Sequence, residues 1–275
     1  MQITGQTKIT GLFGDPVQYS LSPAMHNAAF KHLQLPYVYL PFPVDKSKLA
    51  AAVEAVRALK ITGVNVTVPH KEAVIPYLDR LDRSAERCGA VNTIVNRDGV
   101  LTGYNTDGQG FIDALAEAGF TPAGKKVVIL GAGGAARAVA AALIDQGAAE
   151  IMLINRTLQK AAALADFLGP QASYRQLIPH SKVEVAAVDL VVNTLSIPFR
   201  QEDQWLLDLT DARGALFYDL RYGKMPSDFL VLADELNSPR LDGLGMLLHQ
   251  GARAFTLFTG QAAPVEVMRA ALLQS

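Results

Sequence analysis

The sequence predicts an α/β protein built from two domains. Its 275 residues exceed one typical domain, since domains commonly contain about 100 to 200 residues. Apolar runs with the length of buried strands alternate with helical patterns, which is typical of a doubly wound parallel sheet. The clearest transition lies at residues 126–142, where a strand, a glycine-rich turn and a helix follow one another.

Composition restricts the classes of function. Half of the residues are apolar, 19% are charged and the net charge is −1, so we expect no nucleic-acid partner. Cys88 is the single cysteine, which rules out an internal disulfide and any paired-cysteine metal motif. The first thirty residues contain no long apolar core. We therefore expect a cytoplasmic protein with no membrane association and no bound metal.

The first half of the chain is predicted to alternate strands and helices. Strands are expected at 8–13, 37–42 and 63–68, followed by a hairpin or strand pair at 88–95 and 100–104. Helices are expected at 25–33, 48–59 and 110–118, and another near His70. Short clusters of Asn, Thr and charged residues follow these strands. Open α/β sheets bind ligands at the carboxyl ends of strands, so these clusters are candidate site residues.

The first cluster contains Ser20 and Ser22. In an extended segment these two hydroxyls can project the same way, which suits a polyol. Pro23 favours extension at Ser22 and can then open a helix. Ser22 could alternatively serve only as the N-cap of that helix.

The later clusters also admit two interpretations. Asn65 and Thr67 share one face of their strand, an arrangement that serves either a site or solubility. Lys71 alone is consistent with an ordinary surface lysine. Asp107 alone is consistent with a helix cap.

The glycine-rich turn matches a dinucleotide-binding fingerprint, GxGxxA, through Gly131, Gly133 and Ala136. Gly131 allows the tight turn, Gly133 removes a side chain where a pyrophosphate approaches, and Ala136 lets the helix lie close to the strand. The helix N-terminus offers free N–H groups to phosphate. An apolar run at 150–154 completes a βαβ unit, which predicts a Rossmann-like domain.

The residues after that second strand indicate the cofactor. Asn155, Arg156 and Thr157 stand where an NAD site would place an acidic residue for the ribose hydroxyls. An arginine there favours a 2′-phosphate, so we predict NADP; the alternative is a solvated surface arginine. Further strands are expected at 185–193 and 215–220.

The last part of the chain is predicted to be helical. One helix follows Gly243, and a final helix at 264–273 is expected to pack on the first domain and make it discontinuous. We therefore expect a substrate-binding domain at 1–105 plus 244–275 and an NADP-binding domain at 106–243, with a cleft between them.

Seven motifs in this order resemble those of shikimate dehydrogenases. They are SLSP at 20–23, NVTVPHK at 65–71, GAVNT at 89–93, GYNTD at 103–107, GAGGAA at 131–136, NRT at 155–157 and DGLGMLLHQGARAF at 242–255. The resemblance covers nearly the whole chain. It implies reversible reduction of 3-dehydroshikimate to shikimate by NADPH, on the route to chorismate and the aromatic amino acids.

The resemblance also implies roles for individual residues. Lys71 and Asp107 would be the catalytic pair that handles the proton. The residues that would bind the substrate are Ser20, Ser22, Asn65, Thr67, Asn92, Tyr222 and Gln250. The residues that would bind NADP are Gly131, Ala132, Gly133, Gly134, Ala135, Asn155, Arg156, Thr157, Thr194, Gly243 and Met246. Met246 could equally be a core residue, as methionines at helical spacing often are.

Two loops depart from the family pattern. After Thr194 the family usually has Thr or Ser and then glycine, whereas this chain has LSIPF at 195–199. After Tyr222 the family commonly has Asn-Pro and later Thr-Pro, whereas this chain has GKMPSDF at 223–229. Two alternatives therefore stay open: a quinate/shikimate dehydrogenase with broader substrate or cofactor use, and a catalytically weak dinucleotide-binding paralogue. A monomer or a homodimer is expected.

Overall fold

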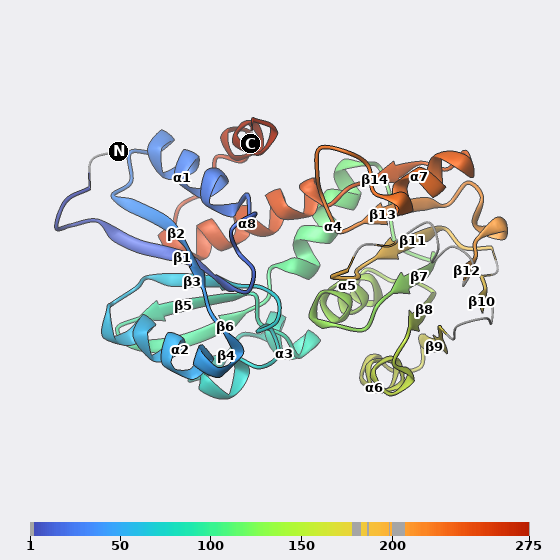
Figure 1. Ribbon diagram of the computed structural model, residues 1–275, viewed down its shortest axis with the longest axis horizontal. Helices are drawn as coiled ribbons and strands as arrows, with labels where there is room; N and C mark the ends of the chain where they lie inside the picture. Colours follow the sequence, from blue (N-terminus) through green and yellow to red (C-terminus); the bar gives the residue numbers. More distant parts are fainter. Residues whose placement is uncertain (1–2, 178–182, 186, 198, 200–206, 275) are drawn as a thin grey trace. The chain divides into compact units, whose positions relative to one another are not determined.

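The computed structural model describes residues 3–177, 183–185, 187–197, 199 and 207–274 (Figure 1). The chain forms two compact units, Met1–Phe111 with Leu247–Ser275, and Ile112–Met246. Both boundaries fall inside helices, α4 (Asp107–Glu117) and α8 (Leu244–Thr259). In the described part of the chain, no helix is both long and apolar enough to cross a membrane.

The first unit contains a six-stranded mixed sheet in the order β2-β1-β3-β5-β6-β4. Its strands are β1 (Lys8–Gly14), β2 (Tyr37–Pro43), β3 (Gly63–Val66), β4 (Arg80–Leu81), β5 (Thr93–Arg97) and β6 (Val100–Tyr104). Strand β5 is antiparallel to β3 and β6, and the other neighbours are parallel. Asp98 and Gly99 join β5 to β6 with φ of 52° and 89°. A two-residue hairpin turn of type I′ needs positive φ at both positions, so the predicted hairpin is confirmed. Its first strand, predicted at 88–95, starts too early, because Cys88 ends a helix that spans Arg83–Cys88 and β5 begins only at Thr93.

Helices cover both faces of this sheet. Its helices are α1 (Ser22–His32), α2 (Leu49–Ala58), α3 (Arg83–Cys88), α8 and α9 (Val265–Leu273), with a short 3₁₀ helix η1 (Lys46–Lys48) before α2. Leu12 joins the core formed with α1, α8 and α9, whereas its neighbour Phe13 joins the core formed with α2. This is the alternation expected of strand side chains. Helix α9 packs on α1 through Met268, which confirms that the last helix returns to the first part of the chain.

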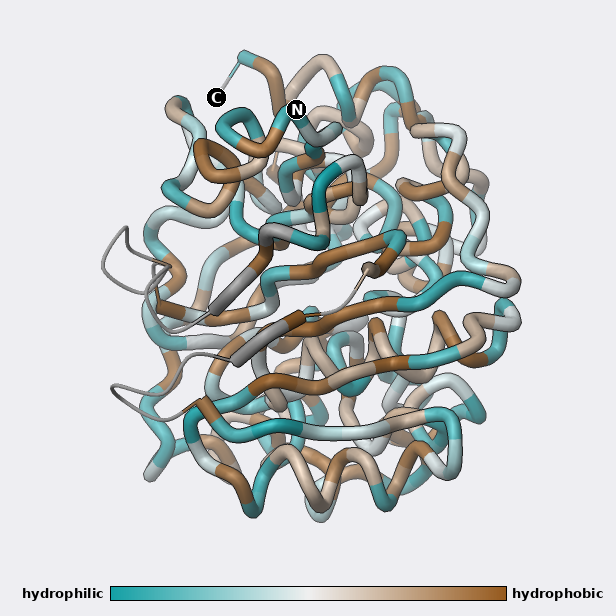
Figure 2. The backbone as a smooth tube through the Cα atoms, turned by 90° about the vertical axis from the view of Figure 1, so that its right-hand side faces the viewer, coloured by the Kyte–Doolittle hydropathy of each residue, from teal (hydrophilic) through white to brown (hydrophobic). Residues whose placement is uncertain are grey.

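The second unit is a parallel sheet in the order β14-β13-β11-β7-β8-β9 (Figure 1). Its strands are β7 (Lys126–Leu130), β8 (Glu150–Asn155), β9 (Ala172–Gln176), β11 (Leu190–Asn193), β13 (Leu216–Asp219) and β14 (Arg240–Leu241). The order reverses between β7 and β11, which is where doubly wound sheets bind their ligands. Figure 2, which faces this unit, shows strands in the middle of the view that are largely hydrophobic, as expected for a sheet buried on both faces. The predicted Rossmann-like fold is confirmed.

The connections of the second unit are helices or short segments. The helices are α5 (Gly134–Asp145), α6 (Leu158–Leu168) and α7 (Asp228–Glu235), and a 3₁₀ helix, η4 (Thr210–Ala212), precedes β13. A separate two-stranded pair joins β10 (Val183–Glu184) to β12 (Leu207–Asp208). The single strand predicted at 185–193 is therefore too long: the structure has β11 from Leu190 and separates it from β10, and residue 186 lies outside the described residues.

One predicted helix is wrong. Residues after Pro69 form consecutive turns and then a 3₁₀ helix, η2 (Ile75–Tyr77), instead of an α-helix beginning near His70. Pro76 would fall in the second turn of such a helix, where it lacks an N–H to donate and its ring meets the preceding carbonyl. The His70 ring is instead hydrogen-bonded through Nε2 to the Val44 carbonyl, 2.7 Å away. This anchor holds the turn that carries Lys71.

Candidate active site

Lys71 and Asp107 form a close, largely buried ion pair in the first unit. Lys71 Nζ lies 2.6 Å from Asp107 Oδ2, and the two side chains are 15% and 6% exposed. Lys71 stands in the turn after β3, and Asp107 is the first residue of α4. A hydrogen bond from the Val91 N–H to the Lys71 carbonyl ties that turn to the segment before β5. A pair this shielded needs further hydrogen bonds to offset its desolvation.

Asn105, not Asp107, caps the start of α4. Its Oδ1 accepts hydrogen bonds from the backbone N–H groups of Asp107 at 3.0 Å and Gly108 at 3.5 Å. Its Nδ2 donates to the Ala90 carbonyl at 2.9 Å. The Asp107 carboxylate is thereby left to pair with Lys71. The sequence did contain a signal for this cap, because Asn is a preferred residue for capping a helix start and Asn105 lies two residues before α4.

Asn92 and Gln250 extend the ion pair into a network. Asn92 Nδ2 donates to Asp107 Oδ1 at 2.8 Å and lies 3.4 Å from Gln250 Oε1. Gln250 comes from α8, far along the chain, and approaches α4 at Gly110. A Cβ at Gly110 would lie 2.5 Å from the Gln250 backbone nitrogen, so glycine permits this close approach. The predicted site residues Lys71, Asp107, Asn92 and Gln250 are brought together.

Asn65 joins the same network through residues that were not singled out in the sequence. Its Oδ1 accepts from the Tyr39 hydroxyl at 2.8 Å, and its Nδ2 donates to Thr93 Oγ1 at 2.9 Å. The Tyr39 ring stacks on the buried imidazole of His26, with centroids 4.4 Å apart. Burial lowers the pKa of His26 to about 3, so this ring is neutral near pH 7.

Ser20, Ser22 and Thr67 lie in the same unit. Ser22 is the first residue of α1, Leu21 occupies the N-cap position, and no side chain caps the helix, so Ser22 is not a cap. The Ser20 hydroxyl accepts from the Ser22 N–H at 3.3 Å. A Cβ at Gly14 would lie 2.3 Å from the Thr67 methyl, which places Thr67 against the end of β1. Among the described residues, no hydrogen bond links these three side chains to the network.

Gly131 and Gly133, in the glycine-rich turn of the second unit, differ in whether protein packing requires a glycine. Gly131 has φ of +114°, and a Cβ there would lie 2.5 Å from Thr194 Oγ1, so the fold itself requires glycine. Gly133 precedes α5 with extended backbone, and a Cβ there would meet nothing within 4 Å. Protein packing therefore gives no reason for glycine at 133. Ala136 is fully buried, as a close approach of helix to strand demands.

The start of α5 fits a dinucleotide pyrophosphate. This twelve-residue helix has no side-chain cap at its N-terminus, so its first N–H groups remain available. Ala132, Gly134 and Ala135 are half-buried around that end and place no bulk over it. Because Gly133 leaves open space at the same point, a phosphate could approach the backbone.

The NRT segment, residues 155–157, lies between β8 and α6. Asn155 Nδ2 donates to the Thr157 carbonyl at 2.9 Å, and Gln176 of β9 donates to the Arg156 carbonyl at 3.2 Å. These bonds hold the backbone while the Arg156 side chain stays exposed. Lys160, in the first turn of α6, is a second exposed cation near this segment and lies outside the NRT motif.

Gly243 and Met246 follow β14. A Cβ at Gly243 would lie 2.1 Å from the Leu220 carbonyl oxygen, so backbone packing explains this glycine. Met246 is 7% exposed, and its backbone is hydrogen-bonded to the Tyr218 hydroxyl. Burial raises the pKa of Tyr218 well above its usual range. The cofactor role of Gly243 and Met246 stays a prediction.

The two loops that depart from the family pattern pack on each other. Phe199 and Phe229 meet edge to face with ring centroids 5.6 Å apart; residue 198 lies outside the described residues. Asp219, at the end of β13, accepts from Ser227 Oγ at 2.5 Å and from the Arg221 N–H at 3.0 Å. Burial raises the pKa of Asp219 in spite of these donors. Asp219 thus holds both ends of the loop that follows Tyr222.

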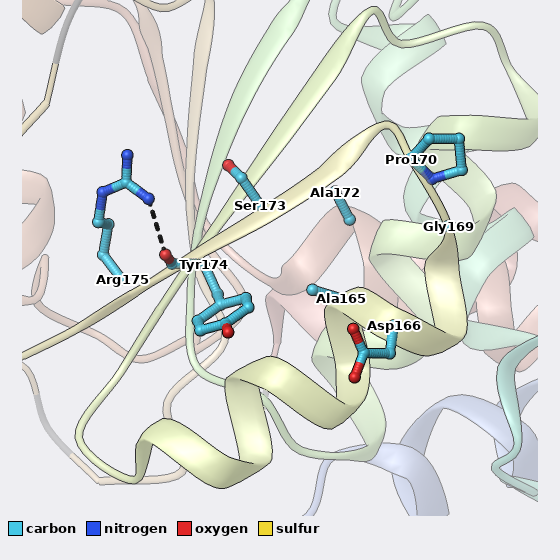
Figure 3. A pocket seen from close by; sticks show the side chains of 8 residues that line it. All are labelled: Ala165, Asp166, Gly169, Pro170, Ala172, Ser173, Tyr174 and Arg175. Carbon is cyan, nitrogen blue, oxygen red and sulfur yellow. Dashed lines mark hydrogen bonds between the residues drawn. The ribbon is translucent and has the colours of Figure 1, made fainter.

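The second unit contains two hollows that the sequence did not predict. A cavity of about 430 Å³ is lined by Tyr222 together with Arg221, Lys224 and Ser227. A wider depression of about 610 Å³ lies between α6 and β9, where Figure 3 shows Tyr174 and the Arg175 side chain that donates to the Tyr174 carbonyl. None of the residues that line this second hollow belongs to the predicted site.

The fold and the glycine turn define a two-unit α/β protein with a Rossmann-like dinucleotide-binding unit. Three family models match the chain: the shikimate dehydrogenase substrate binding domain at 12–94, shikimate / quinate 5-dehydrogenase at 114–213, and the shikimate 5'-dehydrogenase C-terminal domain at 243–273. A shikimate dehydrogenase (NADP(+)) from Moorella thermoacetica is 50% identical over 275 residues, covering 98% of this chain and 93% of the relative. The chain belongs to the shikimate dehydrogenase family.

Solved structures agree with this family assignment. A crystal structure of a shikimate dehydrogenase in complex with NADP⁺ is 39% identical, with a TM-score of 0.89, covering 99% of this chain and 97% of that one. The shikimate 5-dehydrogenase from Thermus thermophilus in complex with NADP(H) and shikimate is 36% identical, with a TM-score of 0.83, covering 98% of this chain and 99% of that one.

Proposed function

We propose that this protein catalyses the reversible reduction of 3-dehydroshikimate to shikimate with NADPH. The observation that carries the proposal is the shielded Lys71–Asp107 pair, 2.6 Å apart, at the centre of a network of amide side chains. The family's motifs carry both residues. NADPH supplies the hydride that is added to the carbonyl carbon.

Lys71 acts on the carbonyl oxygen of the substrate. As the hydride arrives, negative charge develops on the oxygen, and an ammonium group beside it lowers the barrier and delivers a proton. Asp107 keeps the ammonium in place through Oδ2, while Asn92 occupies Oδ1. In the direction of alcohol oxidation the Lys71 amine accepts the hydroxyl proton instead.

The substrate would be held by polar side chains suited to hydroxyls and a carboxylate. We assign this role to Ser20, Ser22, Asn65, Thr67, Asn92, Tyr222 and Gln250. Support comes from the network that already joins Asn65, Asn92 and Gln250 to the Lys71–Asp107 pair. Because hydrogen-bonded sites reject analogues that lack the matching group, this set favours a polyol.

NADP would be held by the second unit. The open space at Gly133 and the uncapped start of α5 suit the pyrophosphate, and the exposed Arg156 suits the 2′-phosphate, with Lys160 as a further cation. We assign the other contacts to Gly131, Ala132, Gly134, Ala135, Asn155, Thr157, Thr194, Gly243 and Met246. The substrate-binding and NADP-binding roles of residues 1–105 with 244–275 and of residues 106–243 belong to the same proposal.

A quinate/shikimate dehydrogenase is the second candidate. The family model that matches residues 114–213 names both substrates, and the loops at 195–199 and 223–229 differ from the usual pattern. A weak paralogue is less well supported, because the proton-handling pair is formed at 2.6 Å.

The direct test follows NADPH formation with shikimate, with quinate and without substrate, and repeats each reaction with NAD⁺. We expect turnover with shikimate and NADP⁺, and at least tenfold lower kcat/KM in the other combinations. Comparable kcat/KM with quinate would favour the second candidate. No turnover with either alcohol would overturn both.

A further inference from the structure

Thr93 lies at the centre of a buried network of hydrogen bonds. Which atom donates and which accepts in each bond follows from the groups at the ends of the network that can play only one of these roles. Thr93 and Asn92 are 0% and 2% exposed, and Asn65 is 6% exposed. Amide and hydroxyl groups can donate or accept, whereas backbone N–H groups only donate and carbonyl and carboxylate oxygens only accept. The groups of fixed character therefore determine the others.

The first fixed end orients Asn92. The Thr106 N–H lies 2.8 Å from Asn92 Oδ1, so that amide atom must be the oxygen. On the other side, Asn92 Nδ2 faces the Asp107 carboxylate at 2.8 Å, which only accepts. Both contacts require the same orientation.

The orientation of Asn92 decides the role of Thr93. Thr93 Oγ1 lies 2.9 Å from Asn92 Oδ1. Because the amide oxygen carries no proton, the Thr93 hydroxyl must be the donor in this bond. Its one hydroxyl proton is then committed. Towards Asn65, whose amide lies 2.9 Å away, Thr93 can only accept.

The amide of Asn65 is oriented in turn. Its Nδ2 faces Thr93 Oγ1 at 2.9 Å and the Asn92 backbone carbonyl at 3.2 Å, so both of its N–H bonds are used inside the protein. Its Oδ1 accepts from the Tyr39 hydroxyl at 2.8 Å. A carbonyl oxygen has two acceptor positions, so Oδ1 retains one.

We propose that Asn65 contacts its ligand solely as a hydrogen-bond acceptor, through Oδ1, and that Thr93 is the positioning residue that commits Asn65 to this role. The inference rests on the proposed function for the identity of the ligand, a polyol with a hydroxyl that donates to Asn65. A ring position that carries fluorine or hydrogen instead of this hydroxyl cannot make the contact. Thr93 thereby contributes to substrate specificity without touching the substrate.

The direction of the network can be tested without an activity assay, by comparing the thermal stability of Asn65→Asp with that of Asn65→Ala. An ionised Asp would face the lone pairs of Thr93 and the Asn92 carbonyl, whereas a protonated Asp can donate to them. Lys71 and Asp107, the charged groups of the network, carry opposite charges, and the His26 ring that stacks on Tyr39 stays neutral because burial lowers its pKa to about 3. The pKa of the introduced carboxyl should therefore be raised by folding, and its contribution to stability should fall as pH rises.

We expect the Tm of Asn65→Asp, relative to Asn65→Ala, to fall by several degrees from pH 5 to pH 7.5. A constant or rising difference would mean that Thr93 donates to Asn65, and would overturn the proposal. This comparison stands even if shikimate is not the substrate, so its failure is distinguishable from failure of the proposed function.

The positioning role can be tested with Thr93→Val and Thr93→Ser. Valine keeps the shape and removes the hydroxyl, so we expect KM for shikimate to rise about fivefold to tenfold with kcat within twofold of the parent. Serine restores the hydroxyl and should bring KM back within about twofold. Equal losses in kcat and KM, an unchanged KM in Thr93→Val, or no recovery in Thr93→Ser would contradict the role.

The acceptor-only contact can be tested with shikimate analogues in which one hydroxyl at a time is replaced by hydrogen or by fluorine. At the position that Asn65 contacts, the fluoro analogue should bind the parent enzyme no better than the deoxy analogue, because fluorine cannot donate. In Asn65→Ala the loss caused by either replacement should shrink at least fivefold. Parent affinity that fluorine preserves at every position would overturn the proposal.

Discussion

The two candidate binding regions are built in opposite ways. In the first unit, side chains such as Asn65, Asn92 and Asp107 are buried and already hydrogen-bonded to one another. In the second, the region around Gly133 consists of backbone, small residues and open space, with the exposed Arg156 after the next strand. One region has its geometry set by internal bonds, whereas the other offers unpaired N–H groups.

This difference predicts different consequences of mutation. Removing one member of a buried network leaves its partners unsatisfied, so it affects the binding or the chemistry of the site together with stability. Adding a side chain to an open backbone site leaves the fold unchanged and blocks the ligand.

Asp107→Asn should have the largest effect. It removes the charge that holds Lys71, and we expect kcat with shikimate to fall about 100-fold or more, since a misplaced proton donor forfeits most of general acid catalysis. Asp189→Asn is the matched control, because Asp189 forms an exposed ion pair with Lys125. The control should stay within twofold of the parent. Equal kinetics for Asp107→Asn and the parent would remove Asp107 from the mechanism.

Arg156→Ala should act on one cofactor only. We expect KM for NADP⁺ to rise about 30-fold, the value of a charge-assisted hydrogen bond to phosphate, with little change for NAD⁺. Arg240→Ala, which removes an exposed arginine paired with Asp234, should affect neither cofactor. Equal losses for NADP⁺ and NAD⁺ would refute recognition of the 2′-phosphate by Arg156.

His26→Phe should make the first unit less sensitive to acid. The pKa of His26 is about 3 when folded against an ordinary value of 6.5, so the neutral ring stabilises the fold above pH 6.5 and this stability is lost as pH falls towards 3. Between pH 6.5 and 5 the parent should lose about 2 kcal/mol of unfolding free energy from this group. Phenylalanine keeps the stacking on Tyr39 and removes the titration. Chemical denaturation at both pH values measures the difference, and an identical loss in parent and variant would contradict it.

Gly131→Ala and Gly133→Ala form a matched pair within the second unit. Alanine at 131 meets Thr194 and a φ of +114°, so we expect a loss of about 1 to 3 kcal/mol in stability. Alanine at 133 meets nothing, so stability should be unchanged while the Kd for NADP⁺ rises about tenfold or more. The reverse pattern would show that glycine at 133 serves the fold.

Local patterns predicted much of the fold. The Asp98–Gly99 turn and the strand-to-helix transition at Gly131 each depend on a few consecutive residues, and both expected structures formed. The helix expected near His70 failed because Pro76 lies too close for a second turn. The alternative role of Ser22 as an N-cap is excluded because α1 already includes Ser22 and starts three residues before the helix predicted at 25–33.

The candidate site was predictable only where single residues match a motif. Lys71, Asp107, Asn92 and Gln250 follow from the family resemblance. The roles of Tyr39 and Thr93 depend on contacts across three strands of the mixed sheet, which no local pattern predicts. When a hydroxyl or amide group meets another such group, the sequence also does not show which of the two donates the hydrogen bond. That information comes from the fixed donors and acceptors at the ends of the network.

We expect Lys71 to handle the proton and to take no part in binding the cofactor. The experiment that separates these two roles measures kcat with shikimate and the Kd for NADP⁺ in Lys71→Ala, with Lys125→Ala as the surface control. We predict that kcat falls about 100-fold or more while the Kd for NADP⁺ stays within twofold of the parent. Unchanged shikimate turnover in Lys71→Ala would show that Lys71 does not handle the proton.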